Sequence, residues 1–308
     1  MKKNLLTLGK IVVTLALVFW LIDRVDWGGV RTELSQVSWL LLGLYVVFQL
    51  TGNLISARKW QIIASYKELH FTLKEGFFTY LTGAFINNFL PSTIGGDAYR
   101  GLWLAKRSGA RAAALSTVVF DRFIGLWTTA LLALVLSFTL WSHLWESIPL
   151  LITLSALFGF LVVDLLITFL YCQSWFQGFV SRLSFQKIRR LLEEIIFYTK
   201  QHIWFRTSLW SGLFIVVGIG LSNYTLFRAL GSEVSFLPFL AAILLVAVVS
   251  SIPISINNIG IKEWAYVAFL GLIGVSIETA VTAALLSRFI QMILSFIALP
   301  QYLSTRKQ

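Results

Sequence analysis

Two short polar stretches that interrupt long apolar runs carry the residue types best suited to binding chemistry. Residues 90–101 read LPSTIGGDAYRG, and residues 251–264 read SIPISINNIGIKEW. Each has a Pro, then small and polar residues, then a carboxylate, which is Asp97 in the first stretch and Glu263 in the second. Because proline lacks an N–H donor and disfavours helix at the residue before it, the chain must turn at each break.

The glycines that follow these prolines favour the approach of an anion. Glycine permits backbone dihedrals and close contacts that a side chain would forbid. A helix that begins near Gly96 would direct its free N–H groups and the positive end of its dipole at the break, and Arg100 lies one turn further along. Such a place suits an anionic group such as a phosphate. The residues predicted to shape the two breaks are Pro91, Gly95, Gly96, Pro253 and Gly260.

Two arginines lie inside apolar runs and need partners there. Arg122 lies in VVFDRFIGLW and Arg288 in LLSRFIQMIL, each 25 positions after a carboxylate of the breaks. A charge at the centre of a spanning helix costs about 2.5–3.5 kcal/mol on insertion scales, so each arginine should be paired. We predict that Asp97 or Asp121 pairs with Arg122, and that Glu263 pairs with Arg288. The pairs could serve only to fasten helices together, or one arginine could stay partly free to hold a phosphate with two parallel hydrogen bonds.

Other kinds of site find little support in the sequence. Cys172 is the single cysteine, and the three histidines (His70, His143 and His202) are scattered, without metal-ligand spacing to one another, to the cysteine or to carboxylates. The sequence contains no recognisable nucleophile arrangement and no G-x-x-x-x-G-K-[ST] phosphate loop. We therefore expect no catalytic residue, no metal, no cofactor and no direct use of ATP.

The composition predicts that these residues are held by membrane-spanning helices. Hydrophobic residues make up 57% of the 308 positions and charged residues 13%, with a mean hydropathy of +0.80, whereas a soluble domain is roughly a quarter charged. We expect an all-α polytopic membrane protein, a single integral membrane domain over residues 1–308 with about six spanning helices and two Pro-broken re-entrant hairpins. The strongly apolar runs, each near the length that crosses a bilayer as helix, are at about 8–23, 37–57, 112–138, 149–172, 208–228 and 275–302.

The positions of Lys and Arg predict how the chain crosses the membrane. If the broken stretches 77–105 and 237–272 are hairpins, 18 of the 25 basic residues fall in cytoplasmic segments. A single kinked span in place of the first hairpin would put the basic segment 173–207 outside. We therefore predict a multi-pass protein of the cell membrane with both termini in the cytoplasm, and we interpret the net charge of +11 as loop bias rather than nucleic-acid binding. Segment 173–207 mixes aromatic and basic residues at helical spacing and is predicted to be a cytoplasmic amphipathic connector on the inner leaflet.

The two halves of the chain match each other in opposite orientation. GNLISAR (52–58) matches SNYTLFR (222–228), and LSTVVFDR resembles VTAALLSR around the two buried arginines. Under the predicted topology, the first half (37–138) enters its hairpin from the cytoplasm and the second (208–302) enters from outside. Transporters built from such inverted repeats bind their substrates at broken helices near the membrane midplane.

The motifs at both breaks and around both arginines resemble a known family. They are ARKW (57–60), NNFLPSTIGGDAYR (87–100), STVVFDR (116–122), IPISINNIGIKE (252–263) and SR (287–288). In this order they resemble the transmembrane domain of lysylphosphatidylglycerol synthases, a flippase-like family of bacterial and archaeal membrane proteins. The resemblance covers nearly the whole chain, and the P-x-x-x-G-G-D-x-x-R element is its specific part. Asn257–Asn258 stand where the family more often has small residues such as Gly.

The resemblance implies lipid translocation. In two-part members of the family, this domain is thought to move an aminoacylated phospholipid to the outer leaflet after a separate soluble domain has made it. Because the sequence ends at QYLSTRKQ without such a domain, we expect the chain itself not to be an enzyme. The residues expected to line or support the headgroup path are Arg58, Asp97, Arg100, Arg122, Glu263 and Arg288.

Two hypotheses on function follow. The first is a flippase or scramblase for an anionic or aminoacylated phospholipid, or a related lipid-linked headgroup, driven by a proton gradient through Asp97, Glu263 or Asp164 or acting by passive equilibration. Asp164 is otherwise expected to accept a hydrogen bond from a neighbouring helix. The second is a membrane subunit that binds a polyprenyl-phosphate or glycolipid intermediate and presents it to a separate lipid-modifying enzyme. Neither hypothesis predicts an oligomeric state.

Overall fold

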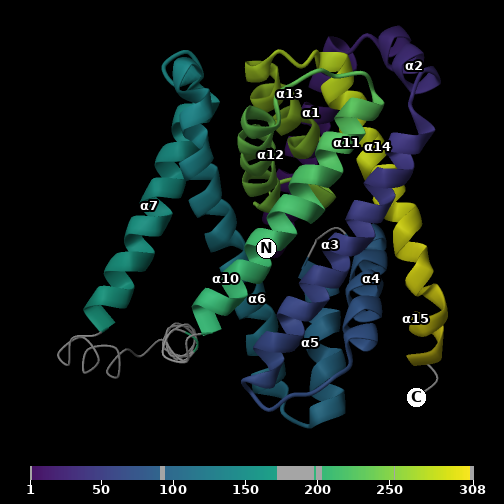
Figure 1. Cartoon of the computed structure of the whole chain (residues 1–308). Helices are drawn as coiled ribbons and strands as arrows, with labels where there is room; N and C mark the ends of the chain where they lie inside the picture. Colours follow the sequence, from purple (N-terminus) through teal and green to yellow (C-terminus); the bar gives the residue numbers. More distant parts are fainter. Residues whose placement is uncertain (1, 91–93, 172–197, 199–202, 253, 306–308) are drawn as a thin grey trace.

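The structure, a computed structural model, describes residues 2–90, 94–171, 198, 203–252 and 254–305, and every regular element in these residues is a helix (Figure 1). The α-helices are α1 (Lys2–Arg24), α2 (Trp27–Ser35), α3 (Trp39–Ser65), α4 (Leu73–Phe89), α5 (Ile94–Ser108), α6 (Arg111–Leu136), α7 (Ile148–Tyr171), α10 (Ile203–Phe214), α11 (Ser222–Ala229), α12 (Phe236–Ser251), α13 (Ile261–Leu270), α14 (Ile277–Ser295) and α15 (Leu299–Thr305). Short 3-10 helices are η1 (Ser137–His143), η3 (Ile256–Asn258), η4 (Gly271–Ile273) and η5 (Phe296–Ala298), and η2 (Ile215–Leu221) is a π-helix.

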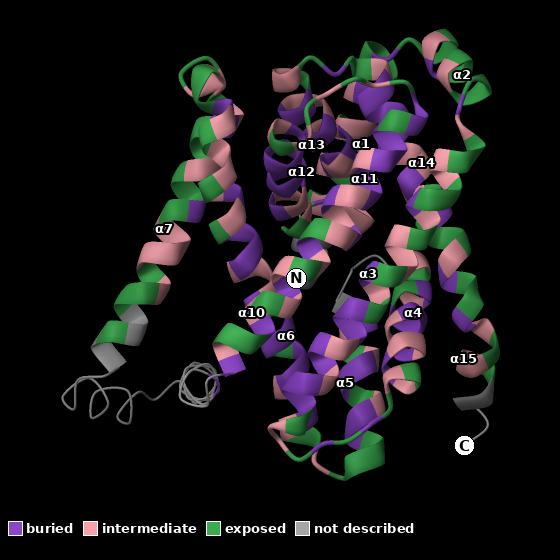
Figure 2. Ribbon diagram, in the orientation of Figure 1, coloured by how far each residue is buried: buried purple, intermediate pink, exposed green. Residues whose placement is uncertain are grey.

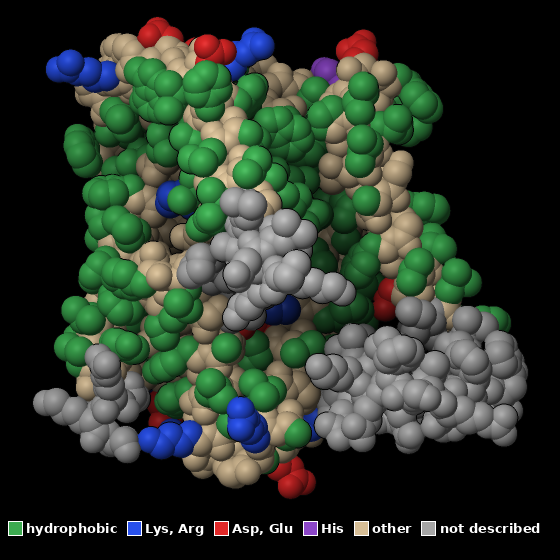
Figure 3. Space-filling model, turned by 180° about the vertical axis from the view of Figure 1, so that it is seen from behind, with side chains coloured by type: hydrophobic (Ala, Val, Ile, Leu, Met, Phe, Trp, Pro, Cys, Tyr) green, Lys and Arg blue, Asp and Glu red, His purple; other side chains and the backbone are tan. Residues whose placement is uncertain are grey.

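Long apolar helices confirm the predicted polytopic, all-α membrane protein. In the part of the chain that the structure describes, five helical stretches are long and apolar enough to cross a membrane: Trp39–Ser65, Arg111–His143, Ile148–Leu166, Ile203–Ala229 and Ile277–Leu303. They cover five of the six runs expected from the sequence, and the remaining run, 8–23, falls within the 23-residue helix α1. Hydrophobic side chains cover the middle of the molecule in Figure 3, while charged side chains gather toward its two ends.

Both Pro-broken stretches fold as hairpins of short helices. The helices of the first hairpin, α4 and α5, have 17 and 15 residues and pack against each other, as do α12 and α13 with 16 and 10 residues in the second. Each is shorter than the ~20 residues of an average spanning helix. Figure 1 shows α4 and α5 in the lower half of the molecule and α12 and α13 in the upper half.

A contact between two glycines holds the first hairpin closed. A Cβ at Gly96 would lie 2.3 Å from the carbonyl oxygen of Gly83, so the two helices touch through their backbones there. The side chain of Asn87 accepts a hydrogen bond from the N–H of Gly96 at 2.7 Å and satisfies one free donor at the start of α5. Gly95 is equally crowded, since a Cβ there would meet the side chain of Leu90 at 2.1 Å. Pro91 lies outside the described residues.

Left-handed backbone shapes the second break. Asn257, Asn258 and Gly260 have φ angles of 48°, 57° and 84°. Gly adopts this conformation at least cost and Asn is the residue that most often replaces it. The asparagines at 257 and 258 are therefore compatible with the turn that a small residue would make. Pro253 lies outside the described residues.

The core of the upper half surrounds α12, whose side chains are buried on almost all sides (Figure 2). The helix α7, in contrast, stands at one side of the bundle and exposes most of its length. Of the predicted connector 173–207, residues 173–197 and 199–202 lie outside the described residues. Tyr198 stacks on Phe120 of α6 with ring centroids 3.9 Å apart. The last residues of this connector, from Ile203 on, belong to α10, which continues as a spanning helix.

Two of the spanning helices also meet at glycines. The spanning helix formed by α10, η2 and α11 packs along α3, and the π-helical segment η2 lies at the crossing. A Cβ at Gly52 of α3 would come within 2.6 Å of the Cα of Gly218 in η2. The two backbones are therefore in direct contact at this point.

The hairpin contact predicts a selective cost for added volume. The substitution Gly96→Ala should destabilise the protein by about 1–3 kcal/mol, because the new methyl group overlaps the backbone of α4. The matched control is Gly159→Ala on α7, where a Cβ meets nothing within 4 Å and alanine is the better helix former. Thermal unfolding of the purified protein in detergent measures both. Equal melting temperatures for the two variants would contradict the close approach.

Candidate functional site

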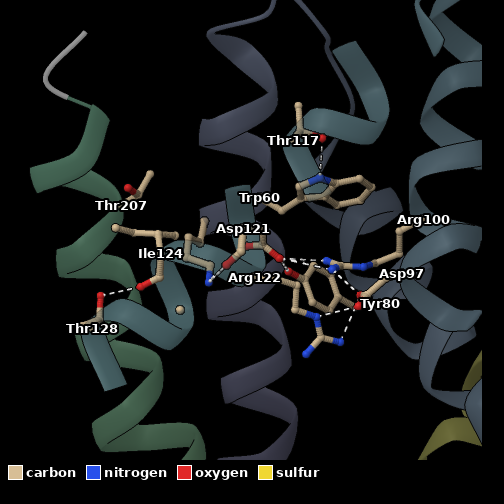
Figure 4. A network of polar contacts seen from close by, with 12 residues as sticks. Trp60, Tyr80, Asp97, Arg100, Thr117, Asp121, Arg122, Ile124, Thr128 and Thr207 are labelled. Carbon is tan, nitrogen blue, oxygen red and sulfur yellow. Dashed lines mark hydrogen bonds and ion pairs between the residues drawn. The ribbon is translucent and has the colours of Figure 1, made fainter. Parts of the chain in front are cut away.

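Asp121 is the centre of a buried cluster of charges in the lower half (Figure 4). One of its carboxylate oxygens lies 3.1 Å from Nζ of Lys59, and the other lies 3.1 Å from Nη1 of Arg100. The hydroxyl of Tyr80 donates a hydrogen bond to the second oxygen at 2.6 Å. Asp121, Lys59 and Arg100 are each exposed by 5% or less. Four helices, α3, α4, α5 and α6, are thus joined through one carboxylate.

Asp97 connects this buried cluster to a more exposed arginine. Its Oδ1 accepts a hydrogen bond from Nη2 of Arg100 at 2.8 Å. The same carboxylate holds Arg122 with two hydrogen bonds, from Nε at 2.7 Å and from Nη2 at 3.0 Å. The side chain of Asp97 is 18% exposed and that of Arg122 is 62% exposed. Arg122 therefore keeps its Nη1 donors without a partner among the described residues.

Aromatic rings surround the buried arginine of this cluster. The guanidinium of Arg100 lies 4.0 Å from the ring centroid of Tyr80 and 5.2 Å from that of Trp60. Trp60 is itself fully buried and donates a hydrogen bond to Thr117 at 3.1 Å. A cation over an aromatic face gains electrostatic stabilisation that grows when water is excluded. These rings offset part of the cost of burying Arg100.

The second hairpin holds a simpler charged pair. Oε1 of Glu263 accepts a hydrogen bond from Nη2 of Arg288 at 2.9 Å, and its Oε2 accepts one from the backbone N–H of Gly260 at 2.7 Å. Arg288 also donates to the carbonyl oxygens of Asn257 at 3.0 Å and Asn258 at 3.2 Å. Glu263 caps the start of α13, and Arg288 fastens the break to α14. The hydrogen bonds satisfy backbone groups that the broken helix leaves free.

A small cavity of about 190 Å³, lined by both apolar and polar side chains, lies beside the second hairpin. Its walls come from α3, the α10–α11 helix, α12, α13 and α14. The side chain of Lys262 reaches it, and its Nζ donates a hydrogen bond to Ser287 at 3.0 Å. The lining residues are Gln49, Phe214, Gly218, Ile219, Asn223, Ile243, Val246, Ala247, Ser250, Lys262, Tyr266 and Gln291.

Both predicted ion pairs across the breaks form. Asp97, rather than Asp121, is the partner of Arg122, and Glu263 is the partner of Arg288. Each pair joins the second helix of a hairpin to the span that follows it. The roles of these residues toward a substrate remain predictions.

Arg58 lies apart from the charges that the structure brings together. It donates a hydrogen bond to Gln61, whose amide in turn donates to the backbone oxygen of Phe71 at 2.6 Å. The neighbouring Lys59 joins the Asp121 cluster instead, and sequence reasoning missed it. The signal that could have found it is Asp121 itself, a carboxylate in an apolar run that needs a buried cation.

Lys262 was also missed, although it directly precedes the predicted Glu263. Asp164, in contrast, accepts a hydrogen bond from Nε1 of Trp127 on the neighbouring helix α6 at 3.0 Å, as expected. In the described ranges, no group of three His, Cys, Asp or Glu side chains could hold a metal. Cys172 and His202 lie outside those ranges. What the site offers is therefore a set of fixed charges and hydrogen-bond donors around two helix breaks.

One family model matches the chain. Its description is the lysylphosphatidylglycerol synthase TM region, and the match covers residues 7–298, which include both hairpins and both charged sites. No curated protein matches the chain.

The geometry of the first cluster predicts unequal costs for two charge removals. Asp121→Asn keeps the shape of the side chain but leaves Lys59 and Arg100 buried without their shared counter-ion, so we expect a loss of about 3–5 kcal/mol. Arg122→Gln breaks a pair at a side chain that is 62% exposed, and the loss should stay below about 1 kcal/mol. The free energy of unfolding in mixed micelles measures both. A cost for Arg122→Gln as large as that for Asp121→Asn would refute Asp121 as the centre of the cluster.

Proposed function

Because the chain belongs to the lysylphosphatidylglycerol synthase transmembrane family, whose members are membrane proteins of lipid metabolism or transport, we propose that it moves a phospholipid between the leaflets of the cell membrane. The headgroup is an anionic or aminoacylated one, or a related lipid-linked group. The chain acts without catalysing a covalent change of the lipid, and both its termini face the cytoplasm. The lipid is its only required partner.

The observation that carries this proposal is the pairing of a carboxylate with an arginine at each of two opposed helix breaks. The pairs Asp97–Arg122 and Glu263–Arg288 have the same spacing of 25 positions and connect equivalent helices. The hairpins lie in opposite halves of the molecule (Figure 1). This arrangement supports an inverted repeat of residues 37–138 and 208–302, the architecture in which substrates bind at broken helices.

The exposed side of Arg122 supports a path for the headgroup along the first break. Asp97 occupies its Nε and Nη2, which orients the guanidinium and leaves Nη1 for a phosphate oxygen. Lys and Arg side chains also appear at mid-height on the face shown in Figure 3, within a surface that is otherwise largely hydrophobic. Fixed charges at this depth lower the free-energy cost of moving a charged headgroup out of water. Its acyl chains would stay in the surrounding lipid.

The buried charges act on this path indirectly. Lys59 and Arg100 are occupied by Asp121, so neither is available to a substrate. Arg100 also holds Asp97 at 2.8 Å, and through it sets the position of Arg122. Rigid support of this kind keeps a binding side chain in place while the substrate passes.

Reconstituted liposomes test the proposal. Purified protein should accelerate the loss of inner-leaflet signal from a fluorescent anionic lipid when a membrane-impermeant quencher is added outside. Arg122→Ala should slow this at least tenfold, as expected for the loss of a hydrogen bond to a charged group, worth about 1.5–3 kcal/mol. The matched control is Arg107→Ala, which removes a surface arginine paired with Glu75 at the far end of α5 and should leave the rate unchanged.

The same assay is repeated across an imposed pH gradient, so that transport driven by protons is also detected. Full transport by a folded Arg122→Ala variant would argue against a substrate role for this arginine. No movement of any lipid, with or without the gradient, would contradict translocation and favour a protein that presents a lipid-linked intermediate to a separate enzyme.

A further inference from the structure

The second break is covered by α1, a helix that lies outside the repeat. α1 precedes both predicted halves, 37–138 and 208–302, and packs alongside α13 and η3 (Figure 1). A Cβ at Gly260, the residue that precedes α13, would lie 2.4 Å from the Cβ of Leu17. The side chain of Leu17 therefore lies directly on the backbone of the break.

A hydroxyl of α1 also satisfies a backbone donor of the same break. The N–H of Ile256 donates a hydrogen bond to Oγ1 of Thr14 at 3.0 Å. Thr14 donates its own proton to the carbonyl oxygen of Lys10 at 2.7 Å, which leaves the lone pairs of its oxygen free to accept. Thr14 and Leu17 are three residues apart and so share one face of α1. If α1 moved away, the N–H of Ile256 would need another acceptor, because lipid provides none in the core of a bilayer.

A buried hydroxyl without a partner lies next to this hydrogen bond in the sequence. Ser255 directly precedes Ile256 and is 2% exposed, and its Oγ makes no hydrogen bond with any residue in the described ranges. A buried hydroxyl that lacks a partner costs free energy, and a ligand oxygen that reached it would remove that cost. The break thus holds one unpaired hydroxyl and one N–H whose acceptor comes from a helix outside the repeat.

The C-terminal end of α1 is buried more deeply than the part over the break. Leu21 and Val25 are buried and form a cluster with valines of α2 and α14. Near the break, the side chains of Ile11, Val12 and Leu15 are exposed, and those that face the break are only partly buried. The N-terminal part of α1 can therefore move away from the break while its other end stays attached.

The first break is the more open of the two. A free N–H at the start of its second helix, that of Gly96, is satisfied from within the hairpin by Asn87. The side chain of Arg122 is 62% exposed, whereas that of Arg288 at the second break is 30% exposed. The structure therefore combines an accessible first break with a second break that α1 covers.

We infer that α1 seals a second headgroup site, in which the hydroxyl of Thr14 holds the place of a lipid oxygen. The inference rests on the proposed function and names a regulation of its path. When the N-terminal part of α1 moves aside, the N–H of Ile256 and the hydroxyl of Ser255 become available to an oxygen of the phosphate or glycerol of a headgroup. That oxygen replaces the acceptor that α1 withdraws, so the break opens at a lower cost in free energy when a lipid is present.

Cysteine labelling of the purified protein in detergent tests the seal. The probe is Ser255→Cys in a Cys172→Ser background, and its reaction with N-ethylmaleimide should be slow. Leu17→Ala, which removes the contact with the break, should raise the labelling rate at least tenfold. Thr14→Val, which keeps the shape of the side chain but removes the acceptor, should raise it at least threefold. The matched control Leu15→Ala, at an exposed position of α1, should leave the rate unchanged.

Thermal unfolding shows that each variant is folded. Fast labelling in the background protein, or equal rates with and without Leu17→Ala in folded protein, would overturn the seal. These rates need no movement of lipid between leaflets, so they can be measured and interpreted even if the transport proposal fails.

Protection by added compounds identifies the occupant of the site. In the Leu17→Ala variant, dihexanoyl phosphatidylglycerol should slow the labelling of Ser255→Cys at least threefold, whereas inorganic phosphate at the same concentration should not. Equal protection by inorganic phosphate would overturn the assignment to a lipid headgroup, and so would the absence of protection by the short lipid. In liposomes, Leu17→Ala should move the fluorescent anionic lipid at least threefold faster. An unchanged rate in this folded variant would overturn the place of the site on the lipid path.

Discussion

The need to pair every charge at membrane depth is the constraint on which the rest of this structure depends. Asp121 satisfies it for two cations at once and thereby joins α3, α5 and α6. Asp97 then extends the arrangement to an arginine that is largely exposed. The contacts lead from the buried Asp121 through Arg100 and Asp97 to the exposed Arg122. Arg122, the most accessible of these side chains, is therefore oriented by side chains that are buried. Packing alone could not produce this, because apolar contacts lack direction.

The second half meets the same constraint with fewer groups. Glu263 caps the start of α13 and neutralises Arg288, so one carboxylate serves both the backbone and an ion pair. Arg288 in turn satisfies carbonyl oxygens of the left-handed turn at Asn257 and Asn258. No carboxylate among the described residues forms an ion pair with Lys262, which donates to Ser287 instead. Each break therefore has one carboxylate–arginine pair, to which the first adds Lys59, Arg100 and Asp121 and the second adds Lys262.

Much of this could be predicted from the sequence, because charges in apolar runs are rare and equal spacings of 25 positions are easily found. The class of protein, both hairpins and both ion pairs followed from such rules. The choice between Arg58 and Lys59 did not, since neighbouring residues point about 100° apart on a helix with 3.6 residues per turn. The cavity at Lys262 was out of reach for another reason: five helices distant in sequence form its walls, and no local pattern records their meeting.

The contact between Gly52 and Gly218 is a point about which α3 and the α10–α11 helix could rotate against each other. Two backbones that touch without side chains between them can rock over one another with little change in packing at the point of contact. In α3, with 27 residues, an arm of roughly 20 Å extends from its middle to either end at 1.5 Å per residue. A rotation of about 10° would therefore move each end by roughly 3–4 Å while the crossing stays in place. Gln49 and Asn223 stand within two turns of that crossing and also line the cavity, so the cavity lies near the axis of such a rotation.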